Sequence, residues 1–165
     1  MISWSARSPE ERNLLNPCFT SMVIWHAARG CAAESDRLLS LEETFLVLPT
    51  VLHERTRNAL PTQIRTSLAV WCQQHPIERG RIADRSRHLV PYTREALVFG
   101  GQRGAINLDR GSVDASAAIN SSVSSTLRNS SLEVQTCARK ALFVGRWFGR
   151  AGGPATVMAL LGVRP

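Results

Sequence analysis

One stretch of the chain decides its fold: FLVLPTVLHERTRNALP, residues 45–61. Its first half is a run of apolar side chains that is long enough to be buried in a core. Its second half is polar, carries Arg55 and Arg57, and is closed by Pro61. The stretch predicts a buried element that emerges into a charged loop, and it holds no set of side chains typical of a catalytic centre.

The residues just before this stretch predict a helix. Ser40 and Glu43 have the spacing of a capping box, in which a serine and a glutamate three residues later satisfy free amides at a helix start. Pro49 should kink or end the helix, because proline lacks the amide hydrogen that the helix needs. We therefore predict a kinked, buried helix from 41 to about 53, with a buried strand over 45–52 as the alternative.

Start and stop signals place further helices on either side. Asn16 followed by Pro17 is a favourable helix start, and Gly30 is positioned to end that helix. Thr66 is positioned to cap a later helix, which should stop before Pro76.

The C-terminal part of the chain carries the clearest helical periodicity. A long helix should begin near Ser130, and a short apolar helix over 155–161 should follow the break at Gly152-Gly153-Pro154. The long helix has an apolar stripe at helical spacing: Val134, Cys137, Ala138, Ala141, Leu142, Gly145 and Phe148. At the other end of the chain, residues 1–15 are predicted to be an extended arm, with a short helical turn starting at Ser8.

The segment between these parts has the order of a winged helix-turn-helix. Helices are predicted over 77–88 and 92–103, and the alternating residues of 105–115 suit a β-hairpin. These elements form a predicted winged-helix-like unit over 77–115. Residues 116–131 are rich in serine, alanine and asparagine, which is typical of a flexible surface loop.

Length and composition describe an ordinary globular protein. The chain has 165 residues, of which 44% are hydrophobic, so we predict a mainly α fold in a single domain, 1–165. No window of about 18 residues is apolar enough to span a bilayer. Met1–Arg7 has no apolar core of a signal peptide, so we expect a cytoplasmic protein without membrane contact.

No motif in the sequence points to catalysis, a cofactor or a metal. There is no phosphate-binding loop, and the histidines lack metal-ligand spacing. His53 is the histidine that most merits attention as a site residue, because it is next to Glu54 within the 45–61 stretch. The cysteines form no Cys-x-x-Cys pair and are expected to be small buried residues: Cys18, Cys31, Cys72 and Cys137. We expect no catalytic residues and no cofactor on this chain.

The chain is strongly basic, with a net charge of +7, which favours an acidic partner surface or phosphate groups. Trp147, if exposed, would favour a protein interface. Nine arginines on the predicted helices are candidates for contact with a partner or with nucleic acid: Arg79, Arg81, Arg85, Arg87, Arg94, Arg103, Arg139, Arg146 and Arg150. The alternative is that these side chains form solvated helix faces.

An ordered set of short motifs resembles one protein family. The 45–61 stretch is accompanied by these pieces in sequence order: Asn16-Pro17-Cys18-Phe19, Thr66-Ser67-Leu68 with Trp71, 91–99 (PYTREALVF), Arg146-Trp147-Phe148, and Gly162-Val163-Arg164-Pro165. Together they resemble the middle component of three-component ABC-ATPase systems, which belong to bacterial conflict and anti-phage operons. The resemblance covers almost the whole chain except residues 111–131.

The resemblance implies a small subunit that is not itself an ATPase. Its expected partners are an ABC-type or SMC-like ATPase, which would carry the ATP, and a third component. We therefore expect a non-catalytic adaptor that bridges these two, with a homodimer and contact with DNA as further options. Two alternatives from other classes stay open: a winged-helix transcription regulator that reads DNA through Arg94 and Arg103, and an enzyme whose site is assembled from scattered residues, for example around His53.

Overall fold

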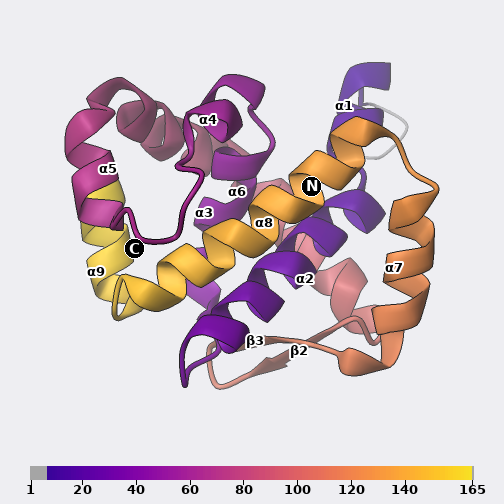
Figure 1. The fold of residues 1–165 in the computed structure, drawn as a ribbon. Helices are drawn as coiled ribbons and strands as arrows, with labels where there is room; N and C mark the ends of the chain where they lie inside the picture. The colour runs from indigo at the N-terminus through magenta and orange to yellow at the C-terminus, as the bar shows by residue number, and fades with distance from the viewer. Residues whose placement is uncertain (1–6, 165) are drawn as a thin grey trace.

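A computed structural model describes residues 7–164 of the chain, and most of them are helical (Figure 1). The helices α2 and α8 lie side by side at the centre, with α6, the longest helix, behind them, α5 and α9 together at one end, and α7 at the other. The helices are α1 (Pro9–Leu14), α2 (Pro17–Glu34), α3 (Leu41–Val51), α4 (Glu54–Ala59), α5 (Leu68–Gln74), α6 (Pro76–Gln102), α7 (Asn120–Arg128), α8 (Leu132–Arg150) and α9 (Pro154–Leu161). The strands are β1 (Leu39–Ser40), β2 (Ile106–Asp109) and β3 (Ser112–Ala115).

Glycines allow α2 and α8 to approach each other at backbone distance. A Cβ added to Gly145 of α8 would overlap the Ala27 carbonyl of α2, and one added to Gly30 of α2 would overlap the Leu142 carbonyl of α8. Gly30 therefore does not end its helix, as the sequence predicted, because α2 continues to Glu34 and the glycine serves helix packing. The two helices run parallel, because Ala27 lies against Gly145 and, one turn further along both helices, Cys31 lies against Gly149.

The core lies around this contact and includes residues from every long helix. Val23 and Ile24 of α2, Leu46 of α3, Ile82 of α6 and Val144 of α8 are all fully buried. The apolar stripe predicted for α8 is largely confirmed, since most of its members are buried.

The predicted capping box at the start of α3 is confirmed. The Ser40 hydroxyl accepts from the Glu43 amide at 3.2 Å, and the Glu43 carboxylate accepts from the Ser40 amide at 2.9 Å. Glu43 is fully buried, and Arg37 neutralises it through two hydrogen bonds of 2.7 Å. A bidentate, charge-assisted pair of this kind gives a buried carboxylate the partner it needs.

The decisive 45–61 stretch forms two helices. Residues 41–51 are α3 with Pro49 inside it, so the alternative of a strand over 45–52 is wrong. The predicted helix ends two residues early, because His53 caps a separate short helix, α4, through its ring nitrogen.

The predicted winged helix-turn-helix is wrong, because α6 is one continuous helix from 76 to 102 with Pro91 in its interior. Its buried positions continue at helical spacing on both sides of the proline: Ile82, Ser86, Thr93, Ala96, Leu97 and Gly100. A proline inside a helix costs about 3 kcal/mol. Packing of this stripe against α2 and α3 outweighs that cost, so no turn separates 77–88 from 92–103.

The predicted hairpin over 105–115 is confirmed. β2 and β3 pair antiparallel, with Ile106 opposite Ala115 and Asp109 opposite Ser112. Arg110 and Gly111 form the two-residue turn, and both have positive φ, as a type I′ turn requires. β1 adds a short third strand at the outer side of β3, giving the order β1-β3-β2.

Residues 116–131 are not the predicted loop. A single 3-10 turn, η2 (Ala117–Ile119), leads into α7, and Ser131 then caps α8. Ile119, Val123 and Leu127 recur every four residues, which is a helical pattern that the surrounding serines obscured. In the N-terminal arm, Ser8 caps α1 through a capping box, while residues 1–6 of that arm lie outside the described residues.

Across residues 7–164, no helix combines the length and the apolar character that crossing a bilayer would require.

The contact between α2 and α8 can be tested with a methyl group. We expect Gly145→Ala to lower the free energy of unfolding by about 1–3 kcal/mol or more, because the added carbon must push against the α2 backbone. Gly80→Ala is the control, since nothing lies within 4 Å of a Cβ there and the helix should gain about 0.5–1 kcal/mol. Urea unfolding measures both, and equal effects of the two variants would contradict this account.

A buried histidine predicts how stability depends on pH. His26 of α2 packs edge-on against Trp25, is 9% exposed, and finds no hydrogen-bond partner for its Nε2 among residues 7–164. Burial, with the nearby charge of Arg29, lowers the pKa of His26 to about 4. Since an unfolded histidine titrates near pH 6.5, the unfolded state binds this proton first, and stability should fall as pH drops from about 6.5 to about 4.

The expected slope from His26 is about 1.4 kcal/mol per pH unit within that window. His26→Gln should remove this part of the slope, whereas replacing the exposed His88 with glutamine is the control. Denaturant unfolding at several pH values from 7 to 4 would measure it, and an unchanged profile in His26→Gln would count against the assignment.

Candidate interaction groove

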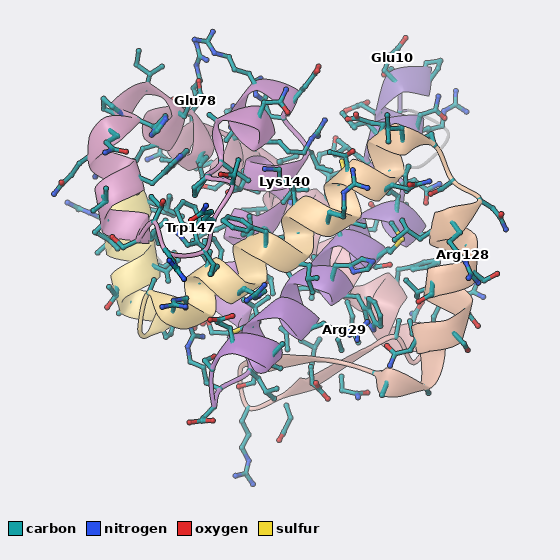
Figure 2. All side chains as sticks on the ribbon, viewed as in Figure 1. Glu10, Arg29, Glu78, Arg128, Lys140 and Trp147 are labelled. Atoms are coloured by element: carbon teal, nitrogen blue, oxygen red, sulfur yellow. The ribbon has the colours of Figure 1, made fainter. Side chains whose placement is uncertain are left out.

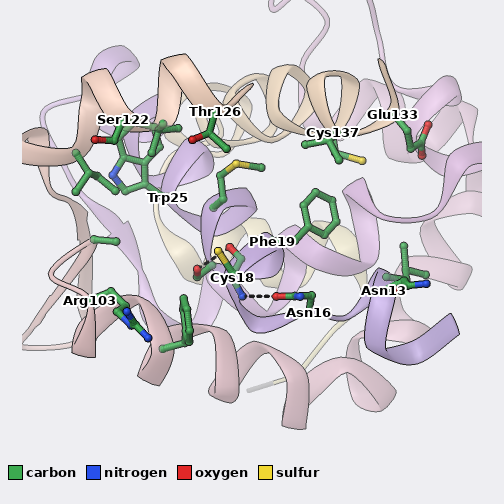
Figure 3. Close-up of a pocket in the computed structure, with 18 of the residues that line it drawn as sticks. Asn13, Asn16, Cys18, Phe19, Trp25, Arg103, Ser122, Thr126, Glu133 and Cys137 are labelled. Atoms are coloured by element: carbon green, nitrogen blue, oxygen red, sulfur yellow. Dashed lines mark hydrogen bonds between the residues drawn. The ribbon is translucent and has the colours of Figure 1, made fainter. Parts of the chain in front are cut away.

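An apolar groove opens between the N-terminal half of α2, the C-terminal end of α6, α7 and the start of α8 (Figure 3). Its volume is about 810 Å³, which is within the range of ligand and peptide sites in proteins. The apolar side chains that line it come from five helices and the segments beside them: Leu14, Cys18, Phe19, Met22, Trp25, Phe99, Ala105, Ile119, Val123, Val134 and Cys137.

The floor of the groove is one face of α2. Cys18, Met22 and Trp25 follow each other at i, i+4 and i+7, so they form a stripe along that helix. Trp25 is held in place because its indole Nε1 donates to the Ser116 carbonyl at 3.1 Å. Trp25 is only 1% exposed, so the open part of the stripe is its N-terminal end, where Cys18 is exposed and Met22 is half-buried.

The wall formed by α7 is weakly attached. None of its residues is buried, and its main contacts are with η2 and α8. Serine and threonine are poor helix formers, and isolated helices shorter than about 12–15 residues are marginal in water. α7 therefore depends on Val123 and the neighbouring apolar groove for its position.

Cysteine behaviour differs from the prediction at one position. Cys31, Cys72 and Cys137 are buried, as expected, and burial raises the pKa of each of these thiols. Cys18 is exposed, because it occupies the open first turn of α2. Its amide donates to the Asn16 side chain at 2.9 Å, which confirms the predicted Asn16 cap.

The 45–61 stretch reaches the groove through Arg57, whose side chain is almost completely buried. Its guanidinium donates to the Val51 carbonyl at 2.8 Å and to the Cys137 sulfur at 3.3 Å, and it forms an ion pair with Glu133. Because Cys137 and Glu133 both line the groove, Arg57 joins α4 to the groove wall on α8.

A second charged network joins the same stretch to α6. The Thr56 hydroxyl donates to Glu78 at 2.7 Å, and the side chain of Arg85 donates to Thr56 and to the Pro49 carbonyl. Burial alone raises the pKa of Glu78, but the Thr56 hydrogen bond and the charges of Arg81 and Arg55 outweigh it, so the pKa is lowered. The polar groups of this network use their hydrogen bonds to hold α3, α4 and α6 together.

A smaller, more polar hollow of about 800 Å³ lies on the other side of Phe99. Arg7 pairs there with Glu95 at 2.8 Å, and the Tyr92 hydroxyl donates to Glu11 at the same distance. The hydrogen bond to Glu11 raises the pKa of Tyr92, as does burial. These contacts fasten α1 and Arg7 to α6.

The candidate arginines of α6 divide into two groups. Arg81 and Arg85 belong to the network around Glu78. The exposed ones, which within residues 7–164 have no ion pair, are Arg79, Arg87 and Arg94, together with Arg103 just after the helix. The structure therefore does not bring the predicted set together as one surface.

Two of the three candidate arginines of α8 form ion pairs with α2. Arg146 and Arg150 both pair with Glu34, at 2.8 and 3.0 Å, whereas Arg139 is exposed and donates to Thr136. Trp147, labelled in Figure 2, is 1% exposed, and its Nε1 donates to the Thr66 carbonyl. Its burial removes the argument for an interface at this tryptophan.

Sequence reasoning missed the groove itself. The spacing of Cys18, Met22 and Trp25 was a usable signal, but such a stripe is as typical of a core as of a binding surface. His53 is largely exposed and caps α4. The partial burial of its ring, together with the nearby charge of Arg85, lowers the pKa of His53. Within residues 7–164, no three histidine, cysteine or acidic side chains gather as a metal site would require.

Comparison with protein families decides the relationship that the ordered motifs suggested. The family model described as ABC-three component (ABC-3C) system Middle Component 3 matches residues 4–165. The chain belongs to this family. The predicted resemblance to a middle component is therefore confirmed, and the family places the chain among the components of an ABC-3C system.

No curated protein and no solved structure matches this Middle Component 3 chain.

The link between Arg57 and the groove wall is testable by stability. We expect Arg57→Met to lower the free energy of unfolding by about 2–4 kcal/mol, because the buried Val51 carbonyl loses its donor and the ion pair is lost. Glu133→Gln should cost less than about 1 kcal/mol, since the Glu133 side chain is 64% exposed. Thermal or urea unfolding would compare them, and a larger loss in Glu133→Gln would reverse the assignment.

Proposed function

We propose that this Middle Component 3 chain is a non-catalytic adaptor in a bacterial anti-phage system. It joins an ABC-type or SMC-like ATPase, which binds the ATP, to a third component. The observation that carries the proposal is the family match over residues 4–165.

The distribution of side chains supports a bridging role, because two different faces are available. The apolar groove lies at the α7 end of the molecule. The exposed guanidinium groups of Arg79 and Arg87 lie on the N-terminal half of α6, which packs against α5 and α9 at the other end. An apolar groove suits a protein segment, whereas a basic face suits an acidic protein surface or phosphates.

The basic face is also where contact with DNA would occur in the assembled system. Such contact would be with phosphates rather than bases, because most arginine contacts go to the DNA backbone and α6 lacks the turn that would set a recognition helix of a helix-turn-helix in the major groove. Because α6 has no turn where one was predicted, the alternative function of a free-standing winged-helix regulator loses its structural support.

Reconstitution tests the adaptor role directly. The chain, the ATPase and the third component are purified separately, mixed in pairs and together at micromolar concentration, and analysed by size exclusion with light scattering. We expect this chain to co-elute with each of the other two and to be required for their joint elution.

Two results would contradict the proposal. One is joint elution of the ATPase and the third component without this chain. The other is failure of this chain to bind either of them while both remain folded and active. Light scattering of the chain alone reports in the same experiment whether it is a homodimer.

A further inference from the structure

The groove is a channel along α2 with the dimensions that one further helix would need. Its floor is the Cys18, Met22 and Trp25 stripe, one wall is α7 with the start of α8, and the other is the end of α6 with α1 (Figure 3). The stripe runs over eight residues, from Cys18 to Trp25, about 10 Å along the axis, so a helix of about two turns matches its length. Cys18 and Met22 are the accessible part of it, and the buried Trp25 closes its far end. Helices commonly bind other proteins by laying apolar side chains at i, i+3 or i+4 and i+7 into such a groove.

Apolar surface continues beyond the groove at one end. Leu14 of α1, which lines the groove, is 52% exposed, and Leu132 at the start of α8 is 73% exposed. Exposed leucine side chains in and beside an apolar groove are typical of an interaction site. A bound segment that covered these two leucines would remove apolar surface from water, which favours binding.

The charges at the two ends differ in sign. Arg103 stands at one end, over the Phe99 ring at 5.3 Å, and within residues 7–164 it has no ion pair. At the other end lie Glu133, already paired with Arg57, and Glu10 of α1. A helix with its C-terminal end at Arg103 and its N-terminal end at Glu10 would have its dipole complemented at both ends.

We propose that the groove binds an amphipathic helix of a partner component, lying parallel to α2, with a carboxylate near its C-terminal end paired to Arg103. The inference rests on the adaptor function proposed above, because it takes the partner from the same three-component system. α7 is the adjustable wall: its weak attachment lets it move outward to admit the helix.

Matched substitutions on α7 provide the test. Ser122 lines the groove and Ser124 does not, yet both are exposed serines of the same helix. We expect Ser122→Trp to fill the groove and to raise the Kd for the bound component at least tenfold. Ser124→Trp should change that Kd less than twofold.

Charge reversal gives a second matched pair. Arg103→Glu at the groove mouth should raise the Kd about tenfold, whereas Arg65→Glu, an equal charge change at an exposed position outside the groove, should not affect binding of the same component. All four substitutions are at exposed positions, so thermal melts should stay within a few degrees of the parent chain.

A photo-crosslinking amino acid at position 122 would identify the bound segment by mass spectrometry. The expected product is a helical peptide with an acidic residue, and replacing that residue with arginine should restore binding to Arg103→Glu. A crosslinker at position 124 is the control and should give no such product.

The outcomes separate this inference from the proposed function. If the parent chain binds a component and the groove variants bind it equally well, the groove inference is wrong and the adaptor function stands. If the parent chain binds neither component, both are wrong. If Ser122→Trp instead converts a homodimer of this chain to a monomer without changing affinity for the components, a second copy occupies the groove and the partner helix is ruled out.

Discussion

The close approach of α2 and α8 is the constraint on which the other elements depend. Gly30 and Gly145 remove the side chains that would separate the two backbones, and Arg146 and Arg150 fasten α8 to Glu34 at the end of α2. Both glycine contacts lie in the C-terminal half of α2. The N-terminal half of the same helix, with Cys18, Met22 and Trp25, is left to α6 and the weakly held α7, and this is where the groove opens.

The 45–61 stretch is best understood as a support for this arrangement. Its apolar half fills the core as α3, and its polar half makes specific contacts instead of forming a free charged loop. Thr56 and the Pro49 carbonyl are tied to α6 through Glu78 and Arg85, while Arg57 is tied to α8 beside the groove. The stretch that carries the family resemblance therefore holds the N-terminal half of α6 against α3 and α4, and it joins α4 to the groove wall on α8.

Net charge alone is a poor guide to the surface of this protein. The chain carries +7, but several of its arginines are committed internally: Arg37, Arg57, Arg81, Arg85, Arg146 and Arg150. Planar guanidinium groups suit this use, because one side chain can satisfy carboxylates and helix-terminal carbonyls together. The arginines that stay exposed on α6 are fewer than the sequence implied: Arg79, Arg87 and Arg94. The apolar groove is therefore a more specific candidate for partner binding than the basic surface.

The sequence by itself determined the mainly helical class, the capping box at Ser40, the Asn16 helix start, the hairpin around Arg110 and Gly111, and the family. These follow from local spacing and from backbone preferences that tertiary contacts did not override. Only the tertiary structure decided that α6 runs through Pro91, that Gly30 lies inside α2, and that serine-rich residues 120–128 form a helix. The first two depend on what packs against the segment from a distant part of the chain, whereas the helical period of Ile119, Val123 and Leu127 was hidden by the serines around it. The groove was hidden because its lining comes from five separate helices.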